Sequence, residues 1–248
     1  MFQAKLAGKN RYHLFNTAQD SGLHNHHEQA KSIRKSLLGN EFILHYQPKV
    51  NMRTGQVIGV EALVRWQQPE LGLQIPDSFL LTLEDLPLAI DIGEWVIEAA
   101  LAQTEIWQDQ GFDLPVSVNV GARQLHQIDF VERLCGIFAR HPKVNPNRLG
   151  LEVLETSAID DMADVSQVIQ QCSDMGVVVT LDNFGTGYTS LAYLKRLPVA
   201  VLKMDQSFVR DMLVNPDDLA ILEGMIGRAR AFHREGIAEG VETVEHGA

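Results

Sequence analysis

Cysteine is scarce in this chain of 248 residues, which contains only Cys135 and Cys172. Neither belongs to a CxxC pair, which excludes the usual cysteine zinc motifs, and two isolated thiols do not make the disulfide framework of a small secreted protein. No apolar run approaches the length of a membrane span, and the first residues lack the apolar core of a signal peptide. The sequence therefore predicts a cytoplasmic protein with no membrane segment.

Basic residues are also few, because 21 Lys and Arg face 32 Asp and Glu and leave a formal net charge of -11. This balance argues against a broad basic surface, so we expect no nucleic-acid polymer as a partner. A small phosphate-containing ligand could still bind if cations were supplied locally. The hydrophobic share of 45% and the charged share of 21% are ordinary for a globular domain.

Strand and helix patterns alternate along most of the chain. The strand patterns cover residues 41–50, 56–66, 116–120, 149–154, 177–183, 199–205 and 236–241. The first two strands should be antiparallel, since only residues 51–55 connect them. The others alternate with helices, including one predicted over residues 123–140, which favours parallel pairing with right-handed crossovers. The pattern predicts an α/β fold with seven strands, one short of a closed eight-stranded barrel.

Polar side chains recur where these strands end. A lone pair such as Asp182 and Asn183, before the Gly185–Gly187 turn, could simply close a strand, but the pattern repeats. The residues concerned are Glu61, Asn119, Glu152, Glu155, Asp182, Asn183, Lys203, Asp205, Glu239 and Glu242. In a barrel these ends meet at one rim, where several carboxylates need a counter-ion. Carboxylate and amide oxygens suit Mg²⁺ or Mn²⁺, and the lack of histidine at these ends disfavours zinc.

Ordered motifs add a family resemblance that covers about residue 41 to the end. They are Tyr46-Gln47-Pro48, Glu61-Ala62-Leu63 with Arg65-Trp66, the segment 118–124, Glu152-Val153-Leu154-Glu155, the segment 182–187, Leu202-Lys203-Met204-Asp205 and the segment 238–243. In these motifs the sequence resembles the EAL family of cyclic di-GMP phosphodiesterases. Residues 4–12 resemble the last helix and strand of a GGDEF, or diguanylate cyclase, domain. We therefore expect the tail of a GGDEF-like domain over residues 1–16, a linker over 17–32 and an EAL domain over 33–248.

The resemblance implies a TIM-like (β/α)8 barrel with one antiparallel strand, and hydrolysis of cyclic di-GMP to linear pGpG with Mg²⁺ or Mn²⁺. Glu61, Asn119, Glu152 and Asp182 would hold the first metal, and Asp182 with Asn183 would lie at the second. Glu239 would orient the attacking water or act as a general base, and Lys203 would position that water and offset phosphate charge. Glu155 would brace the loop after the central strand, where such domains also form homodimers. Gln47, Leu63 and Arg65 would contact the nucleotide.

Two departures from the family pattern leave the activity open. Asn183 stands where active members usually carry a second Asp, which should weaken the second metal. This change would fit a natural loss of activity or a substitution introduced to trap substrate. We also expect the family's last barrel strand to be missing after Ala248. The alternative is a receptor that binds cyclic di-GMP without cleaving it; an unrelated metal-dependent barrel lyase or aldolase would not explain the ordered motifs.

Overall fold

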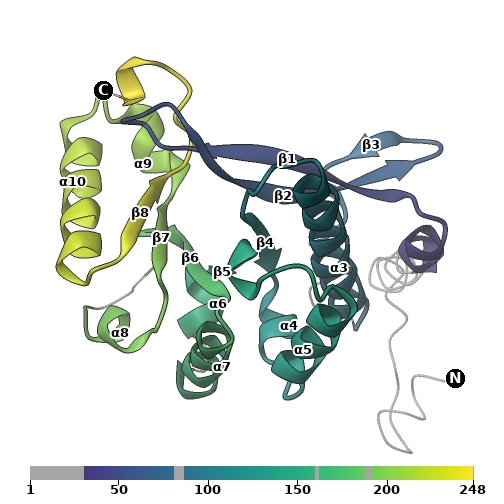
Figure 1. Ribbon diagram of the computed structural model, residues 1–248. Coiled ribbons are helices and arrows are strands. Elements are labelled where there is room, and N and C mark those ends of the chain that lie inside the picture. The colour runs from purple at the N-terminus through teal and green to yellow at the C-terminus, as the bar shows by residue number, and fades with distance from the viewer. Residues whose placement is uncertain (1–30, 81–86, 160–161, 188–190, 248) are drawn as a thin grey trace, which may run out of the picture. The chain divides into compact units, whose positions relative to one another are not determined.

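The computed structural model describes residues 31–80, 87–159, 162–187 and 191–247 (Figure 1). The chain divides into two compact units, Met1–Glu41 and Phe42–Ala248. The described part of the first unit is a helix over residues 31–38, followed by a turn in which Asn40 has a φ of 55°. The predicted GGDEF-like tail and nearly all of the predicted linker lie outside the described residues, although residues 31 and 32 of that linker are helical.

The second unit is built on an eight-stranded mixed sheet with the order β1-β2-β4-β5-β6-β7-β8, in which β3 pairs with β2. The strands are β1 (Phe42–Val50), β2 (Val57–Gln68), β3 (Gly72–Gln74), β4 (Val116–Val120), β5 (Leu149–Leu154), β6 (Val178–Phe184), β7 (Val201–Met204) and β8 (Glu235–Ala238). The predicted α/β class is confirmed, and seven of these strands match the predicted ones. The short strand β3 was not predicted.

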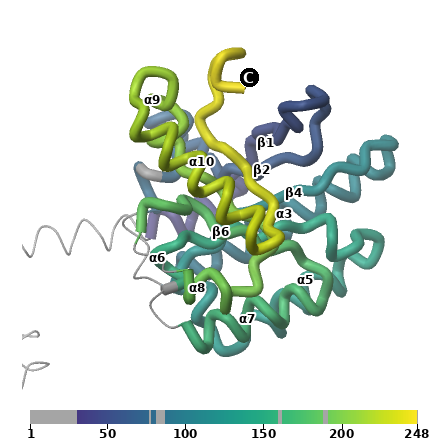
Figure 2. Tube along the Cα trace, turned by 90° about the vertical axis from the view of Figure 1, so that its left-hand side faces the viewer, coloured from purple at the N-terminus to yellow at the C-terminus, as the bar shows by residue number. Residues whose placement is uncertain are grey.

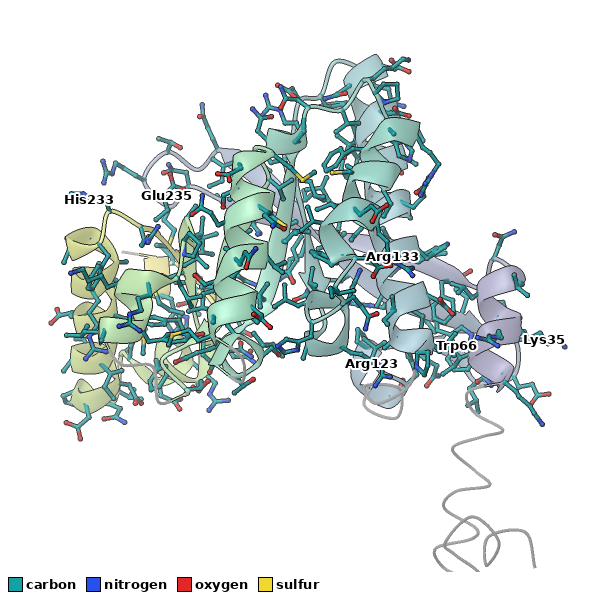
Figure 3. The ribbon with its side chains drawn as sticks, turned by 90° about the horizontal axis from the view of Figure 1, so that it is seen from below. Lys35, Trp66, Arg123, Arg133, His233 and Glu235 are labelled. Atoms are coloured by element: carbon teal, nitrogen blue, oxygen red, sulfur yellow. The ribbon has the colours of Figure 1, made fainter. Side chains whose placement is uncertain are left out.

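Pairing directions also follow the prediction. β1 and β2 are antiparallel, with Phe42 opposite Trp66, whereas β2, β4, β5, β6, β7 and β8 pair in parallel along the order. Within the described residues, β1 and β8 form the two ends of the order, so the sheet is a curled half-barrel. In Figure 3, His233 and Glu235, at the start of β8, lie on one side of the view, and Trp66, near the end of β2, lies on the other.

Helices follow one another around the outer side of this sheet, from α3 beside β1 and β2 to α10 beside β8 (Figure 1). They are α3 (Leu88–Asp109), α4 (Ala122–Leu125), α5 (Phe130–Arg140), α6 (Glu155–Ile159), α7 (Met162–Asp174), α8 (Leu191–Arg196), α9 (Gln206–Asp211) and α10 (Pro216–Ala231), with 3₁₀ turns at Pro76–Ser78, Pro146–Arg148 and Glu245–Gly247. Figure 2 shows α5, α7 and α8 on the side of the unit opposite the C-terminal segment. No helix among the described residues is long and apolar enough to span a bilayer.

The single helix predicted over residues 123–140 is wrong, because α4 ends at Leu125 and α5 begins at Phe130. The side chains of Leu125 and Phe130 are both buried. Residues five apart lie about 140° apart around a continuous helix, so one helix could not bury both against the same surface. The intervening turn solves this conflict, with the Gln127 amide donating to the Gln124 carbonyl.

Two-residue periodicity separates the two faces of the sheet. Val116, Val118 and Val120 of β4 are buried on the face covered by α3, while Ser117 and Asn119 point to the opposite face. At the start of the sheet, the same alternation directs Phe42 and Trp66 into an aromatic cluster with Phe79 and Trp95, in which ring centroids are 5.7–5.9 Å apart. The outer face is therefore the apolar core, which leaves the inner face free for polar residues.

Candidate functional site

The register of the sheet aligns the predicted polar residues on its inner face. Glu61 of β2 pairs with Ser117 of β4, and Asn119 of β4 pairs with Glu152 of β5. Glu152 in turn pairs with Thr180 of β6, two residues before Asp182. Paired residues on neighbouring strands point to the same face, so a single row of side chains runs across the strands. This row is the framework of the site.

Lys203 of β7 lies at the centre of the row, and its side chain is only 2% exposed. Its Nζ contacts one carboxylate oxygen from each of four residues that come from different parts of the sheet. They are Glu152 Oε2 at 2.5 Å, Glu239 Oε1 at 2.8 Å, Glu61 Oε2 at 3.0 Å and Asp182 Oδ1 at 3.4 Å. A buried lysine is costly unless it is paired, and here four acids repay that cost. We call these five residues the Lys203 cluster.

Electrostatics in the Lys203 cluster favour the charged forms of its central pair. Burial acts to lower the pKa of Lys203, but the surrounding carboxylates, Glu152 first, outweigh it and raise the pKa. Burial is also the largest influence on Glu152 and acts to raise its pKa, yet Lys203 and Lys49 together hold that pKa below its usual value. Glu152 and Lys203 are therefore a buried ion pair rather than a neutral pair.

Glu239 differs from the other acids of the cluster. Its side chain, just after β8, is 28% exposed, whereas that of Glu152 is fully buried. Burial raises the pKa of Glu239, Lys203 offsets this only in part, and Asp182 and Glu61 add to the rise. The pKa of Glu239 is therefore raised, which is the direction that suits a proton acceptor.

A second lysine reaches the cluster, which the sequence analysis did not anticipate. Lys49 of β1 donates to Glu152 Oε1 at 2.5 Å and to Ser117 Oγ at 2.6 Å. Strand periodicity could have found it, because Lys49 lies two residues after Gln47 and therefore shares its face. Glu152 thus has one lysine on each carboxylate oxygen.

The other predicted binding residues of β1, β2 and β4 share the inner face. The Asn119 amide donates to Glu61 Oε1 at 2.8 Å, which ties these two predicted metal ligands together. Gln47 is exposed and lies opposite Glu61 in the register. Leu63 and Arg65 follow Glu61 at two-residue steps and are partly buried, and Arg65 Nη1 donates to the neighbouring Val64 carbonyl at 2.8 Å. They extend the row beyond the cluster.

The remaining predicted residues, Asn183 and Glu155, lie near the end of β6 and at the start of α6. Asn183 has a left-handed φ of 54°, which Asn tolerates better than most residues. Its backbone N–H donates to Asp182 Oδ1 at 2.8 Å. The hydrogen bonds that tie Asn183 to its neighbours run through its backbone. Glu155, buried at the start of α6, accepts from the amides of Gly185 at 2.9 Å and Gly187 at 3.3 Å. Glu155 therefore binds the turn after β6 to the end of β5.

The donor set of the Lys203 cluster fits a hard divalent cation. Its carboxylate oxygens, with the amide of Asn119 beside Glu61, are the ligand types that Mg²⁺ and Mn²⁺ prefer. Across the described residues, however, no group of three or more His, Cys, Asp or Glu side chains has the arrangement of a metal site. In this structure the four carboxylates surround the Lys203 ammonium instead.

Comparison with known proteins places these features in a family. A model of the EAL domain matches residues 30–246. The bifunctional diguanylate cyclase/cyclic di-GMP phosphodiesterase MucR of Pseudomonas aeruginosa is 40% identical over 245 residues, which are 98% of this chain and 36% of MucR. The cyclic di-GMP phosphodiesterase PdeR of Escherichia coli is 35% identical over 248 residues, which are 100% of this chain and 37% of PdeR. The chain thus spans about a third of the length of these curated relatives.

The fold agrees with this assignment. A solved structure of the PaMucR phosphodiesterase in complex with c-di-GMP superposes with a TM-score of 0.84 at 39% identity, covering 89% of this chain and 89% of that one. The curled mixed sheet, which begins with the antiparallel pair of β1 and β2, is therefore the TIM-like architecture of EAL structures. The family model covers most of the chain, including every residue of the Lys203 cluster. This chain belongs to the EAL domain family.

Proposed function

We propose that this chain hydrolyses one phosphodiester bond of cyclic di-GMP and releases linear pGpG, in a reaction that depends on Mg²⁺ or Mn²⁺. The observation that carries the proposal is the convergence of four carboxylates on one buried ammonium at the inner face of the sheet. Relatives named as cyclic di-GMP phosphodiesterases, and a similar structure in complex with c-di-GMP, support the choice of substrate.

The cations would be held by the oxygen donors on the inner face of the sheet. Glu61, Asn119, Glu152 and Asp182 would hold the first, and Asp182 with Asn183 the second, weaker one. When bound, they supply charge stabilisation for the phosphodiester and lower the pKa of the attacking water. Asn183 offers a neutral amide where a carboxylate would bind more tightly, so the second cation should need a higher concentration.

The residues of the chain would divide the remaining work. Lys203, already at the centre of the acids, would hold the attacking water in place and offset the negative charge of the phosphate. Glu239 would accept the proton of that water, since its pKa is raised and solvent reaches its side chain. Gln47, Leu63 and Arg65 would contact the nucleotide along the inner face of β1 and β2, and Glu155 would keep the turn after β6 in position.

A receptor that binds cyclic di-GMP without hydrolysing it is the second candidate. Two observations favour it: Asn183 stands where active members of the family usually carry a charged ligand, and the Lys203 ammonium contacts the carboxylates that would bind the cations. The complete set of Glu61, Asn119, Glu152, Asp182 and Glu239 favours the enzyme instead, because a receptor needs no such set. In either role we expect the domain to act in bacterial signalling, next to upstream GGDEF or sensor domains and as a homodimer.

The test compares the parent chain with Asn183→Asp in Mn²⁺, in Mg²⁺ and in EDTA. Conversion of cyclic di-GMP to pGpG is followed by anion-exchange chromatography, and binding is measured by calorimetry. Asn147→Asp is the matched control, since Asn147 is exposed in the turn that precedes β5, at the opposite end of that strand from the site. It introduces the same charge away from the Lys203 cluster.

We expect cation-dependent turnover by the parent, a faster rate in Asn183→Asp, and no change in Asn147→Asp. A silent parent that binds the dinucleotide, together with an active Asn183→Asp variant, would identify a receptor with a dormant site. Turnover in EDTA equal to that in Mn²⁺, or no binding by either protein, would overturn the proposal.

A further inference from the structure

Leu154 is an apolar residue at the rim of the polar site. It follows Glu152 by two residues along β5, so both side chains lie on the inner face of the sheet. The side chain of Glu152 is fully buried, whereas Leu154 is 38% exposed. Leu154 pairs in the register with Asp182, an acid of the Lys203 cluster. A large apolar side chain is thus exposed beside charged groups, at the end of the strand where ligands of such sheets bind.

The neighbouring strand leaves an opening beside Leu154. Val120 of β4 pairs with Val153 of β5, so Gly121 and Leu154 follow at the same level of the sheet. Gly121 is exposed, and a Cβ added to it would meet no heavy atom within 4 Å apart from its chain neighbours. Its φ of −70° and ψ of 152° are open to any residue, so the backbone does not require glycine here. The opening extends from Leu154 across β4 towards β2.

The width of this opening suits one flat ring. Neighbouring strands lie about 4.8 Å apart, so β5 and β2, on either side of β4, are about 9.6 Å apart. A ring between two side chains needs about 7–8 Å, because carbon atoms in contact are about 3.5–4.0 Å apart on each side. Glu61 pairs with Ser117, so Arg65 and Gly121, four residues further along their parallel strands, reach the same level. The opening therefore has Leu154 on one side and Arg65 on the other.

We propose that Leu154 is a base-contacting residue that packs against the face of one guanine of cyclic di-GMP, and that Gly121 leaves the room for this base. The face of a purine is apolar and gains from leaving water against a leucine. A phosphate would gain nothing at this place, because Asp182 lies beside Leu154; its charge belongs with Lys203. This inference rests on the proposed function through its ligand, and it holds whether the chain hydrolyses the dinucleotide or only binds it.

The experiment measures the affinity of the full chain for cyclic di-GMP with two readouts. They are the dissociation constant from calorimetry in EDTA, where the proposed hydrolysis is stopped, and KM for pGpG release in Mn²⁺. We expect Leu154→Ala to weaken binding and to raise KM about fivefold, because the base covers only the exposed part of the leucine. Leu219→Ala is the matched control, since Leu219 of α10 is 42% exposed on the outer side of the sheet, and it should bind like the parent.

Gly121→Thr tests the opening itself by filling it. Gly121 precedes the first residue of α4, a position where threonine and glycine are similarly accepted. We therefore expect an unchanged midpoint of urea unfolding and at least fivefold weaker binding of cyclic di-GMP in Gly121→Thr.

Affinity equal to that of the parent in Leu154→Ala or in Gly121→Thr would overturn the base contact and leave the proposed function standing. Weaker self-association of Leu154→Ala in sedimentation, with unchanged affinity, would overturn it too and would assign Leu154 to an interface between copies of the chain. A parent that neither binds nor cleaves the dinucleotide would instead refute the proposed function.

Discussion

Replacing Lys203 with methionine removes the one positive charge that four carboxylates share, and it should make the stability of the protein depend on divalent cations. The Lys203 ammonium is buried and lies 2.5–3.4 Å from those carboxylate oxygens. Removing one partner of a buried ion pair costs about 3–5 kcal/mol, because the other charge stays buried and unpaired. We expect a loss at the lower end of this range, about 3 kcal/mol, in the free energy of unfolding of Lys203→Met in EDTA, because Glu152 keeps its ion pair with Lys49.

A cation that binds among the acids should restore much of this loss. Binding to the folded state alone contributes about 2.7 kcal/mol at a free concentration of 100 times the dissociation constant. The rise in unfolding free energy on adding Mn²⁺ should be larger for Lys203→Met than for the parent, in which Lys203 already offsets one of the four negative charges.

The assay is urea unfolding followed by circular dichroism, in EDTA and in Mn²⁺. Lys195→Met, on an exposed position of α8, is the control and should stay within about 0.5 kcal/mol of the parent. Equal stability of Lys203→Met and the parent in EDTA would refute the reasoning, and so would a destabilised variant that Mn²⁺ does not rescue.

Three further predictions concern stability. Burial raises the pKa of Tyr46 to about 12 from 10.0, so the stability that comes from burying the neutral phenol is complete below pH 10 and is lost as the pH rises through 12. Tyr46→Phe should therefore flatten the fall in unfolding free energy over this pH range. Equal slopes of unfolding free energy against pH in the variant and the parent, measured by alkaline melts, would contradict this. Glu155→Ala leaves the backbone amides of Gly185 and Gly187 without their acceptor and should lower the free energy of unfolding in urea by about 2 kcal/mol or more. Glu155→Gln keeps a side-chain acceptor and should lower it less. The reverse order of the two variants would contradict a stabilising role of these two hydrogen bonds. Gly185 has a φ of 103°, which residues with a Cβ rarely adopt, so Gly185→Ala should lose about 1–3 kcal/mol even if the flexible Met225 side chain moves aside. Gly136→Ala in α5, with nothing within 4 Å, should lose none, and equal stability of these two variants would refute the backbone strain.

The sequence was a good guide to the sheet because its strands carry a strong two-residue pattern. Val116-Ser117-Val118-Asn119-Val120 alternates apolar and polar residues, and the structure places them on opposite faces. The polar residues at the ends of parallel strands could be gathered in advance, since parallel strands end at the same edge. Leu125 and Phe130 could not be assigned to separate helices in this way, because the break between them follows from tertiary packing against the sheet.

Lys49 escaped prediction for a topological reason. The rule that chemistry lies at the carboxyl ends of strands applies to parallel strands, but β1 runs antiparallel to β2. The carboxyl end of β1 therefore lies at the opposite edge of the sheet from the carboxyl ends of the parallel strands. Lys49, near that end, lies opposite Gly59, two residues before Glu61 along β2. The left-handed backbone conformation of Asn183 was also not predictable from the sequence. The sequence shows a residue type that tolerates this conformation, but it does not show that the chain turns there in a way that requires it.

The most direct test of the proposed phosphodiesterase site compares the parent with Glu239→Gln in Mn²⁺, measuring both the affinity for cyclic di-GMP and the rate of pGpG release. Glutamine keeps the shape of the side chain but cannot accept the proton of the attacking water. General acid–base groups contribute a factor of about 10²–10⁴, so we expect nearly unchanged affinity and at least a 100-fold slower release. Equal rates in the two proteins would contradict the role of Glu239, and failure of the parent to bind cyclic di-GMP would contradict the site as a whole.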